Sequence, residues 1–378
     1  MSAAYVVAAR RTAVAPRNGA FRNVEAHELA APVMQALLRD SSVGRDAVDR
    51  VILGNALYGG GNPARVAALA AGLPASVAAM SIDTQCCAGL DAVAIGASLI
   101  ESGQARIVIA GGVESYSRAP VRATRPRAPG EAPVPYERPP FTPWPDADPD
   151  MIEAAALLAS DMQTLRRDQE AYAIASHRKS IAAQADLARE IVPVAAQIND
   201  AFVRALTETT CRRLPVLQGE ATTGVTAATV AVEADAAAAL LLVDEETMQA
   251  IACGMRPVRI AGVSAGAGDP RQPALAAIEP AKALLARAGF VSSDLAVVEI
   301  MEAFAIQAMA FNHALDIPAE KINRGGGALS RGHPIGASGA ILAVRLFREL
   351  QKDVSGSCGL AAIAAAGGLG SALLLNVL

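Results

Sequence analysis

The pattern of apolar positions along the chain predicts alternating strands and helices. Short apolar runs at 5–9, 51–55 and 105–110 are typical of buried strands, and the last of them ends in paired glycines. Apolar residues at helical spacing predict helices over 25–38 and over the stretch 88–100. Alternation of this kind indicates an α/β layer with a mostly parallel sheet in the first third of the chain.

The middle of the chain has a different character. Ten of the 22 prolines and the single tryptophan fall within 119–149, which predicts an irregular excursion over the surface. Helical patterns return over 151–186, and the runs 192–198 and 238–243 suggest a further strand pair. The residues between the two α/β parts therefore look like an insertion, partly helical, that lies on top of the sheet.

The last third repeats the organisation of the first. Residues 297–301 correspond to the strand at 51–55, and the segment AAIAAAGGLG corresponds to IVIAGGVES. The apolar tail 354–378 fits two buried strands joined by a glycine turn better than a membrane span. An internal duplication is the economical explanation, and it would bring the N-terminal ends of two equivalent helices to a shared cleft.

Composition and charge argue against several classes of function. The 378 residues carry a net charge of −4 without a basic or acidic block, so neither nucleic acid nor a membrane surface is the expected partner. The five cysteines lack metal-ligand spacing: Cys86 and Cys87 are adjacent, and Cys211, Cys253 and Cys358 stand alone. A reduced, cytoplasmic protein without a structural metal or disulfides is the simplest interpretation.

Two positions offer nucleophilic chemistry. Cys86 or Cys87 stands at the predicted start of a buried helix, where free N–H groups and the helix dipole favour a thiolate; the alternative is a pair of small buried apolar residues. His333 lies in a glycine-rich loop ending in proline, whereas His27, His177 and His313 lie on helical patterns as surface or half-buried residues. A cysteine and a histidine that meet at helix N-termini form the pair needed for acyl transfer, although a lone histidine is more often structural.

Several separate motifs, in the same order, give the chain a resemblance to the thiolase family of acyl-CoA acetyltransferases. They are VVAARRTAV, QCCAGLDAV, GGVESYSRAP, DQEAYAIASHRKSIAAQ, MEAFAIQA and GGGALSRGHPIGASGA. The family's CxxGL pattern selects Cys86 over Cys87 as the nucleophile. The resemblance implies that Cys86 takes the acyl group, that His333 activates it, and that the backbone amides of Cys86 and Ala366 form an oxyanion hole.

The resemblance also implies a duplicated α/β fold of two mixed-sheet halves with helices in layers. These halves are expected at 1–118 and 246–378, with an inserted loop domain at 119–245 that carries the last strand of the first half near its end. Coenzyme A is expected as substrate or product without a covalently bound cofactor, in a cytoplasmic homodimer or homotetramer of fatty acid metabolism.

Some positions depart from the family pattern. Met301 replaces the usual asparagine before EAF, and Ala364 replaces the second cysteine, which moves the proton in the carbon–carbon step. The Ser-Gly pair that borders the coenzyme tunnel becomes Ala231 and Val232. A cysteine six residues before Ala364, Cys358, would need a shifted register to compensate.

In the proline-rich segment, Arg122, Arg125 and Arg127 are candidate phosphate contacts or else solvated surface residues. The expected activity is a thiolase-type acyltransfer on acyl-CoA or 3-ketoacyl-CoA. Acylation or hydrolysis without carbon–carbon chemistry, or a non-catalytic partner subunit, is the alternative.

Overall fold

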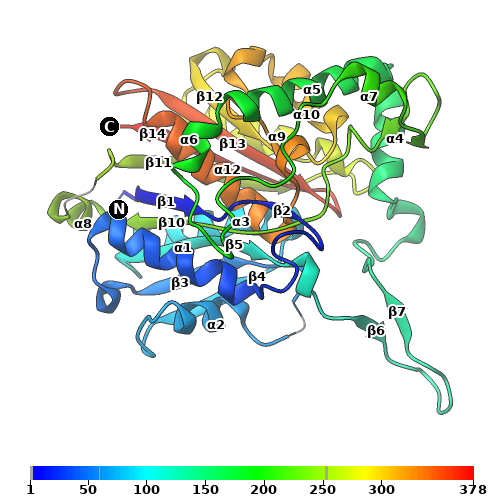
Figure 1. Ribbon diagram of the computed structural model, residues 1–378. Helices are drawn as coiled ribbons and strands as arrows, with labels where there is room; N and C mark the ends of the chain where they lie inside the picture. Colours follow the sequence, from blue (N-terminus) through cyan, green and yellow to red (C-terminus); the bar gives the residue numbers. More distant parts are fainter. Residues whose placement is uncertain (1–2, 59, 252–253) are drawn as a thin grey trace.

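A mixed sheet runs through the molecule and organises the remaining elements (Figure 1). The computed structural model describes residues 3–58, 60–251 and 254–378, so Cys253 lies outside the described residues. The strand order is β12-β13-β14-β11-β1-β10-β5-β3-β4, with β2 (Ala15–Pro16) paired to β10. The strands on this path are β1 (Tyr5–Arg11), β3 (Arg50–Gly54), β4 (Ala78–Ile82), β5 (Ile107–Glu114), β10 (Ala234–Val243), β11 (Val258–Ala267), β12 (Leu295–Ile300), β13 (Cys358–Ala365) and β14 (Leu369–Val377).

The two halves of the sheet have the same pairing pattern. In the first half β1 and β10 are antiparallel, β10 and β5 are antiparallel, and β5, β3 and β4 are parallel. In the second half β11 and β14 are antiparallel, β14 and β13 are antiparallel, and β13 and β12 are parallel. Beyond β12, at the position that β4 occupies in the first half, a single parallel bridge joins Val298 to Ile322. The halves meet where β1 and β11 pair over two residues. The predicted duplicated α/β fold is therefore confirmed.

Helices cover the two halves of the sheet and fill the space between them. Alternate residues of β1 contact helices on opposite faces of the sheet. Val6 belongs to the apolar cluster that contains α3 and α12, and Tyr5 and Val7 belong to the cluster that contains α1 and α2. A third cluster packs α9 and α10 on the outer face of the second half. These helices are α1 (Ala26–Ser41), α2 (Pro63–Ala70), α3 (Ala88–Glu101), α9 (Ile278–Ala288), α10 (Ala305–Leu315) and α12 (Ile335–Leu350), and the short α8 (Glu245–Ala250) and α11 (Ala328–Arg331) complete the halves.

The central helices α3 and α12 approach each other at glycines. A Cβ atom at Gly89 would lie 2.7 Å from the backbone nitrogen of Ala340, and one at Gly339 would lie 2.5 Å from the backbone nitrogen of Leu90. A side chain at either position would force the helices apart. The glycines of CAGL and GASG therefore let the two helix N-termini, which carry the candidate chemistry, come close together.

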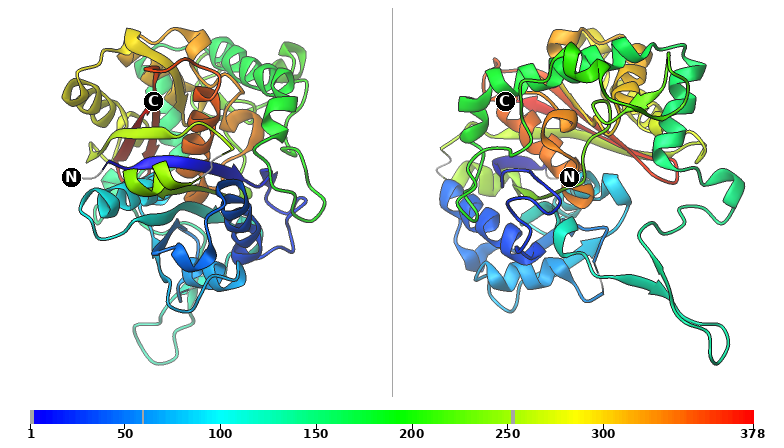
Figure 2. Two further views of the ribbon diagram at one scale, coloured as in Figure 1. Left: turned by 90° about the vertical axis from the view of Figure 1, so that its left-hand side faces the viewer. Right: turned by 45° about the vertical axis from the view of Figure 1, so that its right-hand side comes forward.

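The middle segment is more ordered than its proline content suggests. The run 119–149 is largely exposed, as predicted, but it contains a short hairpin of β6 (Arg122–Thr124) and β7 (Val134–Tyr136), which extends away from the body (Figures 1 and 2). The strand predicted at 192–198 is wrong, because only isolated bridges form there. The other elements are α4 (Met151–Asp161), α5 (Arg166–Ala182), α6 (Gln184–Ala188), α7 (Glu208–Arg212), β8 (Val216–Gln218) and β9 (Val225–Thr226).

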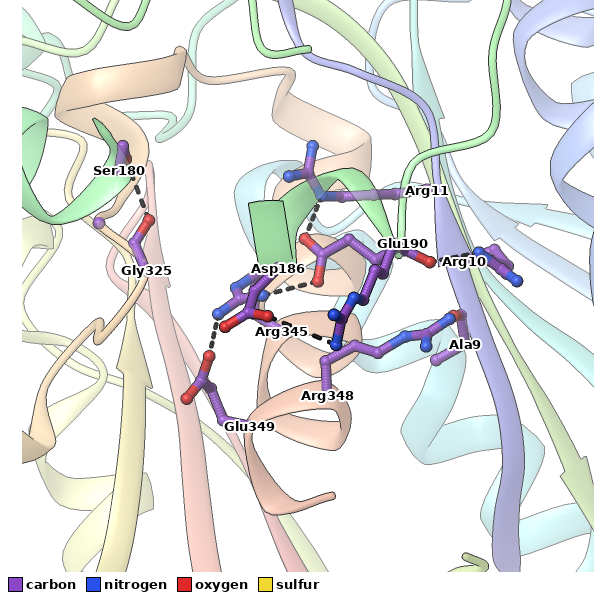
Figure 3. Close-up of polar contacts among 12 residues, drawn as sticks. Ala9, Arg10, Arg11, Ser180, Asp186, Glu190, Gly325, Arg345, Arg348 and Glu349 are labelled. Atoms are coloured by element: carbon purple, nitrogen blue, oxygen red, sulfur yellow. Dashed lines mark hydrogen bonds and ion pairs between the residues drawn. The ribbon is translucent and has the colours of Figure 1, made fainter. Parts of the chain in front are cut away.

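A buried ion cluster joins this middle segment to both halves (Figure 3). Glu190, just after α6, accepts hydrogen bonds from Arg11 of β1 and Arg345 of α12, both at 2.6 Å, and all three side chains are almost fully buried. Arg345 also pairs with Glu349 on the same helix. Burial raises the pKa of Glu190, but the two guanidinium groups outweigh it and lower the pKa below its ordinary value. The carboxylate is thus charged and ties three parts of the chain together.

Within the described residues, the helices are too short or too polar to cross a membrane. The apolar tail forms β13 and β14, which are buried inside the sheet.

Candidate active site

Cys86 stands at a sharp turn between β4 and α3. A single 3₁₀ turn, Gln85–Cys87, runs directly into the helix, and Gln85 has a φ of +54°, which is unusual for a residue with a side chain. The backbone N–H of Gln85 donates to Asp83 Oδ1 at 2.8 Å and holds this turn. The strained turn presents the sulfur of Cys86 to a cavity at the N-terminal end of α3.

The neighbouring Cys87 points elsewhere. Its side chain is buried, with Sγ 3.5 Å from the carbonyl oxygen of Ile363. Burial raises the pKa of its thiol. Cys87 therefore fills space under the turn, and the two cysteines have different surroundings although they are adjacent.

His333 comes from the second half of the chain. The loop that carries it follows α11, where Gly332 has a φ of +114° and a Cβ would lie 2.7 Å from that of Ala234. The backbone N–H of His333 donates to the carbonyl oxygen of Val232 at 2.8 Å, which fixes the loop against the start of β10. The imidazole reaches the turn of Cys86 from this position.

The cysteine and the histidine are in direct contact. Cys86 Sγ lies 3.1 Å from His333 Nε2, and His333 Nδ1 lies 2.7 Å from the hydroxyl oxygen of Ser338. The Ser338 hydroxyl donates its own proton to the carbonyl oxygen of Pro334, so its oxygen accepts from Nδ1–H. Nε2 is left without a proton, as an acceptor for the thiol of Cys86.

Both groups of the pair are neutral at physiological pH. Burial raises the pKa of the Cys86 thiol to about 12, and hydrogen bonds from the backbone amides of Cys86 and Ala366 act in the opposite direction. Burial lowers the pKa of His333 to about 4. A thiol beside an unprotonated imidazole can transfer its proton when an electrophile arrives, and the two amides are placed to stabilise negative charge.

The pair opens into a cavity of about 260 Å³ whose walls are mostly apolar. Its lining includes Cys86, His333 and eight alanines, and an adjoining cavity of about 480 Å³ shares the rim residues Gln85, Tyr116, Phe141, Met151, Glu233 and Ile335. The alanines are Ala154, Ala155, Ala231, Ala274, Ala303, Ala364, Ala365 and Ala366. The two cavities share a rim, and Cys86 is in the lining of the smaller one, so together they have room for a substrate that extends well beyond its reacting group.

The other positions singled out in the sequence fall in different places. Ala231 and Ala364 line the cavity, whereas Met301 is buried in the apolar cluster that contains α3 and α12. Arg122 lines the adjoining cavity and stacks on Tyr136, 5.4 Å from the ring centre. Arg125 and Arg127 are exposed on the hairpin loop, with neither in the lining of the two cavities.

The structure excludes one alternative that the sequence left open and corrects one expectation. Cys358 cannot replace the second cysteine: it begins β13, whereas Ala364 stands near its end, about 20 Å away at the usual rise of a strand. His177 is neither a surface nor a half-buried residue, since it is 1% exposed beside Phe202. Burial lowers its pKa to about 4.

Sequence reasoning missed two residues that support the site. Ser338, in the first turn of α12, accepts a hydrogen bond from His333 Nδ1 and orients the imidazole. Glu114 accepts hydrogen bonds from the backbone N–H groups of Ala56 and Gly336 and so fixes the start of α12 to the first half. Burial raises its pKa to about 7. The only sequence signal for either residue is its place inside the motifs GASG and GGVES.

Among the residues that the structure describes, histidine, cysteine and acidic side chains do not gather in groups of three or more that could hold a metal ion.

Comparison with known proteins gives one consistent result. Residues 4–246 match the family described as Thiolase, N-terminal domain, and residues 256–377 match Thiolase, C-terminal domain. The chain is 40% identical over 99% of both chains to "Putative acetyl-CoA C-acetyltransferase YhfS" of Bacillus subtilis, and 33% identical over the full length of both to "Putative acetyl-CoA C-acetyltransferase VraB" of Staphylococcus aureus. The crystal structure of the Bacillus anthracis acetyl-CoA acetyltransferase superimposes with a TM-score of 0.90 at 31% identity, covering 100% of this chain and 99% of that one.

Proposed function

The chain belongs to the thiolase family and is an acyltransferase of the thiolase type, and we propose that it transfers acyl groups from coenzyme A thioesters through Cys86. The observation that carries this proposal is the 3.1 Å contact between Cys86 Sγ and His333 Nε2, with Nδ1 held by Ser338. The names of the similar proteins support acetyl-CoA as one substrate.

The proposed reaction has two half-reactions. His333 Nε2 takes the proton of Cys86, the sulfur attacks the thioester carbonyl carbon, and the amides of Cys86 and Ala366 stabilise the oxyanion. The carbon–sulfur bond to coenzyme A then breaks, and the leaving thiolate takes the proton from His333. A second acceptor removes the acyl group from Cys86 and restores the free thiol.

Isotope exchange tests the first half-reaction by itself. Incubating the protein with acetyl-CoA and labelled CoA should move the label into acetyl-CoA without any carbon–carbon bond being made. Cys86→Ala should abolish exchange, while Cys87→Ala should retain it because Cys87 points away from the cavity. Exchange that survives in Cys86→Ala would refute the proposal.

The second half-reaction has weaker support. At the positions where the resemblance implies an asparagine and a second cysteine, the apolar side chains Met301 and Ala364 can neither position a water nor carry a proton. We therefore propose that acylation is efficient and that carbon–carbon bond making and breaking is slow.

We propose that coenzyme A reaches Cys86 through the adjoining cavity. Arg122 lines that cavity and is a candidate contact for a coenzyme phosphate, while Ala231, in the lining of the smaller cavity, and the adjacent Val232 are candidates to border the path of the coenzyme. We propose a homodimer or homotetramer, which the exposed edge strand β4 and the extended hairpin would suit. The free thiols fit a cytoplasmic location, and the domain limits at 118 and 245 follow the resemblance.

A further inference from the structure

Tyr116 is a polar residue at the rim that the two cavities share. It begins a 3₁₀ turn just after β5 and lines both cavities, together with Cys86 in the smaller one. Its hydroxyl group makes no hydrogen bond with the residues that the structure describes, and it is not among the polar atoms that are enclosed by protein without a partner. The hydroxyl group therefore contacts open space, and the space that Tyr116 lines is that of the two cavities.

The charges around the phenol place its hydroxyl group on the side of the nucleophile. Burial raises the pKa of Tyr116 well above its ordinary value. Negative charge on Glu233, on ionised Cys86 and on Glu114 raises this pKa further, and Arg17 acts in the opposite direction. Charges have this effect only when they are near the oxygen that titrates, and Cys86 and Glu233 both line the smaller cavity. The phenol thus keeps its proton and is an O–H donor in the neighbourhood of Cys86.

The other polar side chains of the shared rim already have partners. Gln85 donates to Asp83 at 3.0 Å, and Glu233 accepts from Arg17 at 2.9 Å. A carboxylate has no proton to donate to a substrate oxygen. The remaining rim residues have apolar side chains; they are Phe141, Met151 and Ile335. The free O–H group of the rim is therefore that of Tyr116.

The position of the rim decides which substrate atom lies near this donor. In a 3-oxoacyl thioester Cys86 attacks the keto carbon C3, and the backbone amides of Cys86 and Ala366 hold the oxygen of C3. The thioester carbonyl C1 lies beyond C2 on the coenzyme side. Because the coenzyme occupies the adjoining cavity in the proposed binding mode, C1 and its oxygen lie near the shared rim, where Tyr116 stands.

Negative charge develops on the C1 oxygen during the carbon–carbon step. When the C2–C3 bond breaks, the acyl group stays on Cys86, and the electron pair moves onto C2 and the C1 oxygen as an enolate. The proton that His333 took from Cys86 then returns to C2, which releases acetyl-CoA. A hydrogen-bond donor at the C1 oxygen lowers the barrier to this step, and the apolar side chain of Met301 cannot help to supply one.

We propose that Tyr116 is a catalytic residue whose hydroxyl group donates a hydrogen bond to the C1 oxygen of a 3-oxoacyl-CoA and stabilises the enolate. The proposal rests on the proposed function, because it requires transfer of the acyl group through Cys86. Tyr116 supplies a hydrogen bond and no second proton carrier, so the carbon–carbon step remains slow with alanine at position 364.

Tyr116→Phe tests the proposal, because it removes the hydroxyl group and keeps the ring. Cleavage of acetoacetyl-CoA by free CoA should be ~100-fold slower, as is typical when one donor to an oxyanion is lost. Exchange of labelled CoA into acetyl-CoA should change little, since the oxygen of its single thioester carbonyl is held by the amides of Cys86 and Ala366.

Tyr58 provides a matched control. It is 38% exposed and is not in the lining of either cavity. Tyr58→Phe should leave both cleavage and exchange unchanged. The melting temperature of each variant shows whether the fold is intact.

Binding measurements test the same contact without any reaction. S-(3-oxobutyl)-CoA keeps the keto group of acetoacetyl-CoA and lacks the C1 oxygen. In Cys86→Ala, calorimetry should show that acetoacetyl-CoA binds about fivefold more tightly than this analogue, as expected for one hydrogen bond. Adding Tyr116→Phe should remove the preference.

Three results would overturn the proposal. They are equal cleavage rates in Tyr116→Phe and the unmodified protein, equal binding of the two ligands in Cys86→Ala, and a loss of exchange in Tyr116→Phe as large as the loss of cleavage. In the last case the hydroxyl group would act on Cys86 itself. An unmodified protein without exchange would refute the acyl transfer alone, because a binding preference that depends on Tyr116 would still support the contact with C1.

Discussion

The direction of the hydrogen bonds around His333 defines its role as a proton acceptor. The Ser338 hydroxyl donates to Pro334 and therefore receives the Nδ1 proton, so Nε2 faces Cys86 with a free lone pair. The surrounding protein also disfavours the imidazolium ion. The resting pair is thus a thiol and an imidazole, and charge develops only when a thioester is attacked.

The pH dependence of acylation follows from this resting state. The pKa of His333 is lowered to about 4 and that of Cys86 is raised to about 12, so His333 is already unprotonated at pH 5 and the thiol keeps its proton well above neutrality. We expect the acylation rate by acetyl-CoA to fall only as the pH approaches 4. A midpoint near 6.5, the ordinary pKa of imidazole, would contradict this description.

Restoring a proton carrier in the cavity wall should accelerate the carbon–carbon step. Ala364→Cys, which adds a thiol to the lining of the cavity, should raise the rate of acetoacetyl-CoA cleavage by free CoA ~100-fold or more, because general acid–base catalysis typically contributes that much. The rate of Cys86 acylation by acetyl-CoA serves as the control and should change little. Equal cleavage rates would show that the unmodified site already supplies this chemistry by another route.

At the residue scale, local motifs are readable from sequence and long-range partners are not. The spacing of Cys86 to Gly89 and Leu90 and the glycine loop of His333 are local, and both side chains lie in the cavity. The role of Glu114 has no such signature, because it depends on the backbone groups of Ala56 and Gly336 that the fold places opposite it. His177 has an ordinary helical pattern, and only tertiary packing by the middle segment buries it.

At the scale of elements, the crossing of α3 and α12 sets the distance between the two reactive side chains. Gly339→Ala should place a methyl group 2.5 Å from the backbone nitrogen of Leu90. We expect it to lower the free energy of unfolding by ~1–3 kcal/mol and to slow acylation, because the helices must separate.

A second glycine is the control for this substitution. A Cβ at Gly44 meets nothing within 4 Å, and its φ of −68° suits any residue. Gly44→Ala should be neutral or slightly stabilising in chemical denaturation. If the Gly339→Ala protein were as stable as the Gly44→Ala protein, the close approach of α3 and α12 would not require a glycine at this position.

Elements with a clear apolar period were predictable, and those without it were not. The runs at 5–9, 51–55 and 105–110 overlap β1, β3 and β5, because strands buried on both faces are continuously apolar. The run at 192–198 has the same local character, but it forms only an isolated bridge between Val194 and Gln197, and the residue before it, Ile191, bridges Arg11 at the end of β1. Whether an apolar run forms a strand therefore also depends on which strands the fold places beside it, and the sequence of the run does not show this.

At the scale of the whole molecule, the ion cluster of Glu190 connects the middle segment to both halves. Glu190→Gln removes the carboxylate that Arg11 and Arg345 share, while Arg11 keeps its pair with Asp200 and Arg345 keeps its pair with Glu349. We expect a loss of ~2–3 kcal/mol in the free energy of unfolding, as for hydrogen bonds to charged groups. Glu208→Gln, which breaks an exposed pair with Arg212, should cost ~0.5 kcal/mol or less.

The same cluster predicts a window of acid sensitivity. Because the folded protein lowers the pKa of Glu190 below 4.5, its contribution to stability is complete above that pH and is lost as the pH falls through the lower folded value. Unfolding free energies measured from pH 6 downward should therefore converge for Glu190→Gln and the unmodified protein in this acidic range. If the unfolding free energies of the two proteins differed by the same amount at all pH values, Glu190 would not be the charged group that stabilises the fold.

The duplicated architecture was predictable because both halves keep the same order of strand, glycine turn and buried helix. The path of the middle segment was not, since it depends on Glu190 and other contacts made far from it in the sequence.

Intact mass spectrometry after mixing with acetyl-CoA tests whether Cys86 carries the acyl group. We expect one acetyl group per chain, located on Cys86 by peptide mapping, and no adduct in Cys86→Ala. We also expect His333→Gln to form the adduct ~100-fold more slowly or worse, because the proton acceptor is lost. An unmodified protein that gains no acetyl group, or gains it on another residue, would show that Cys86 is not the nucleophile.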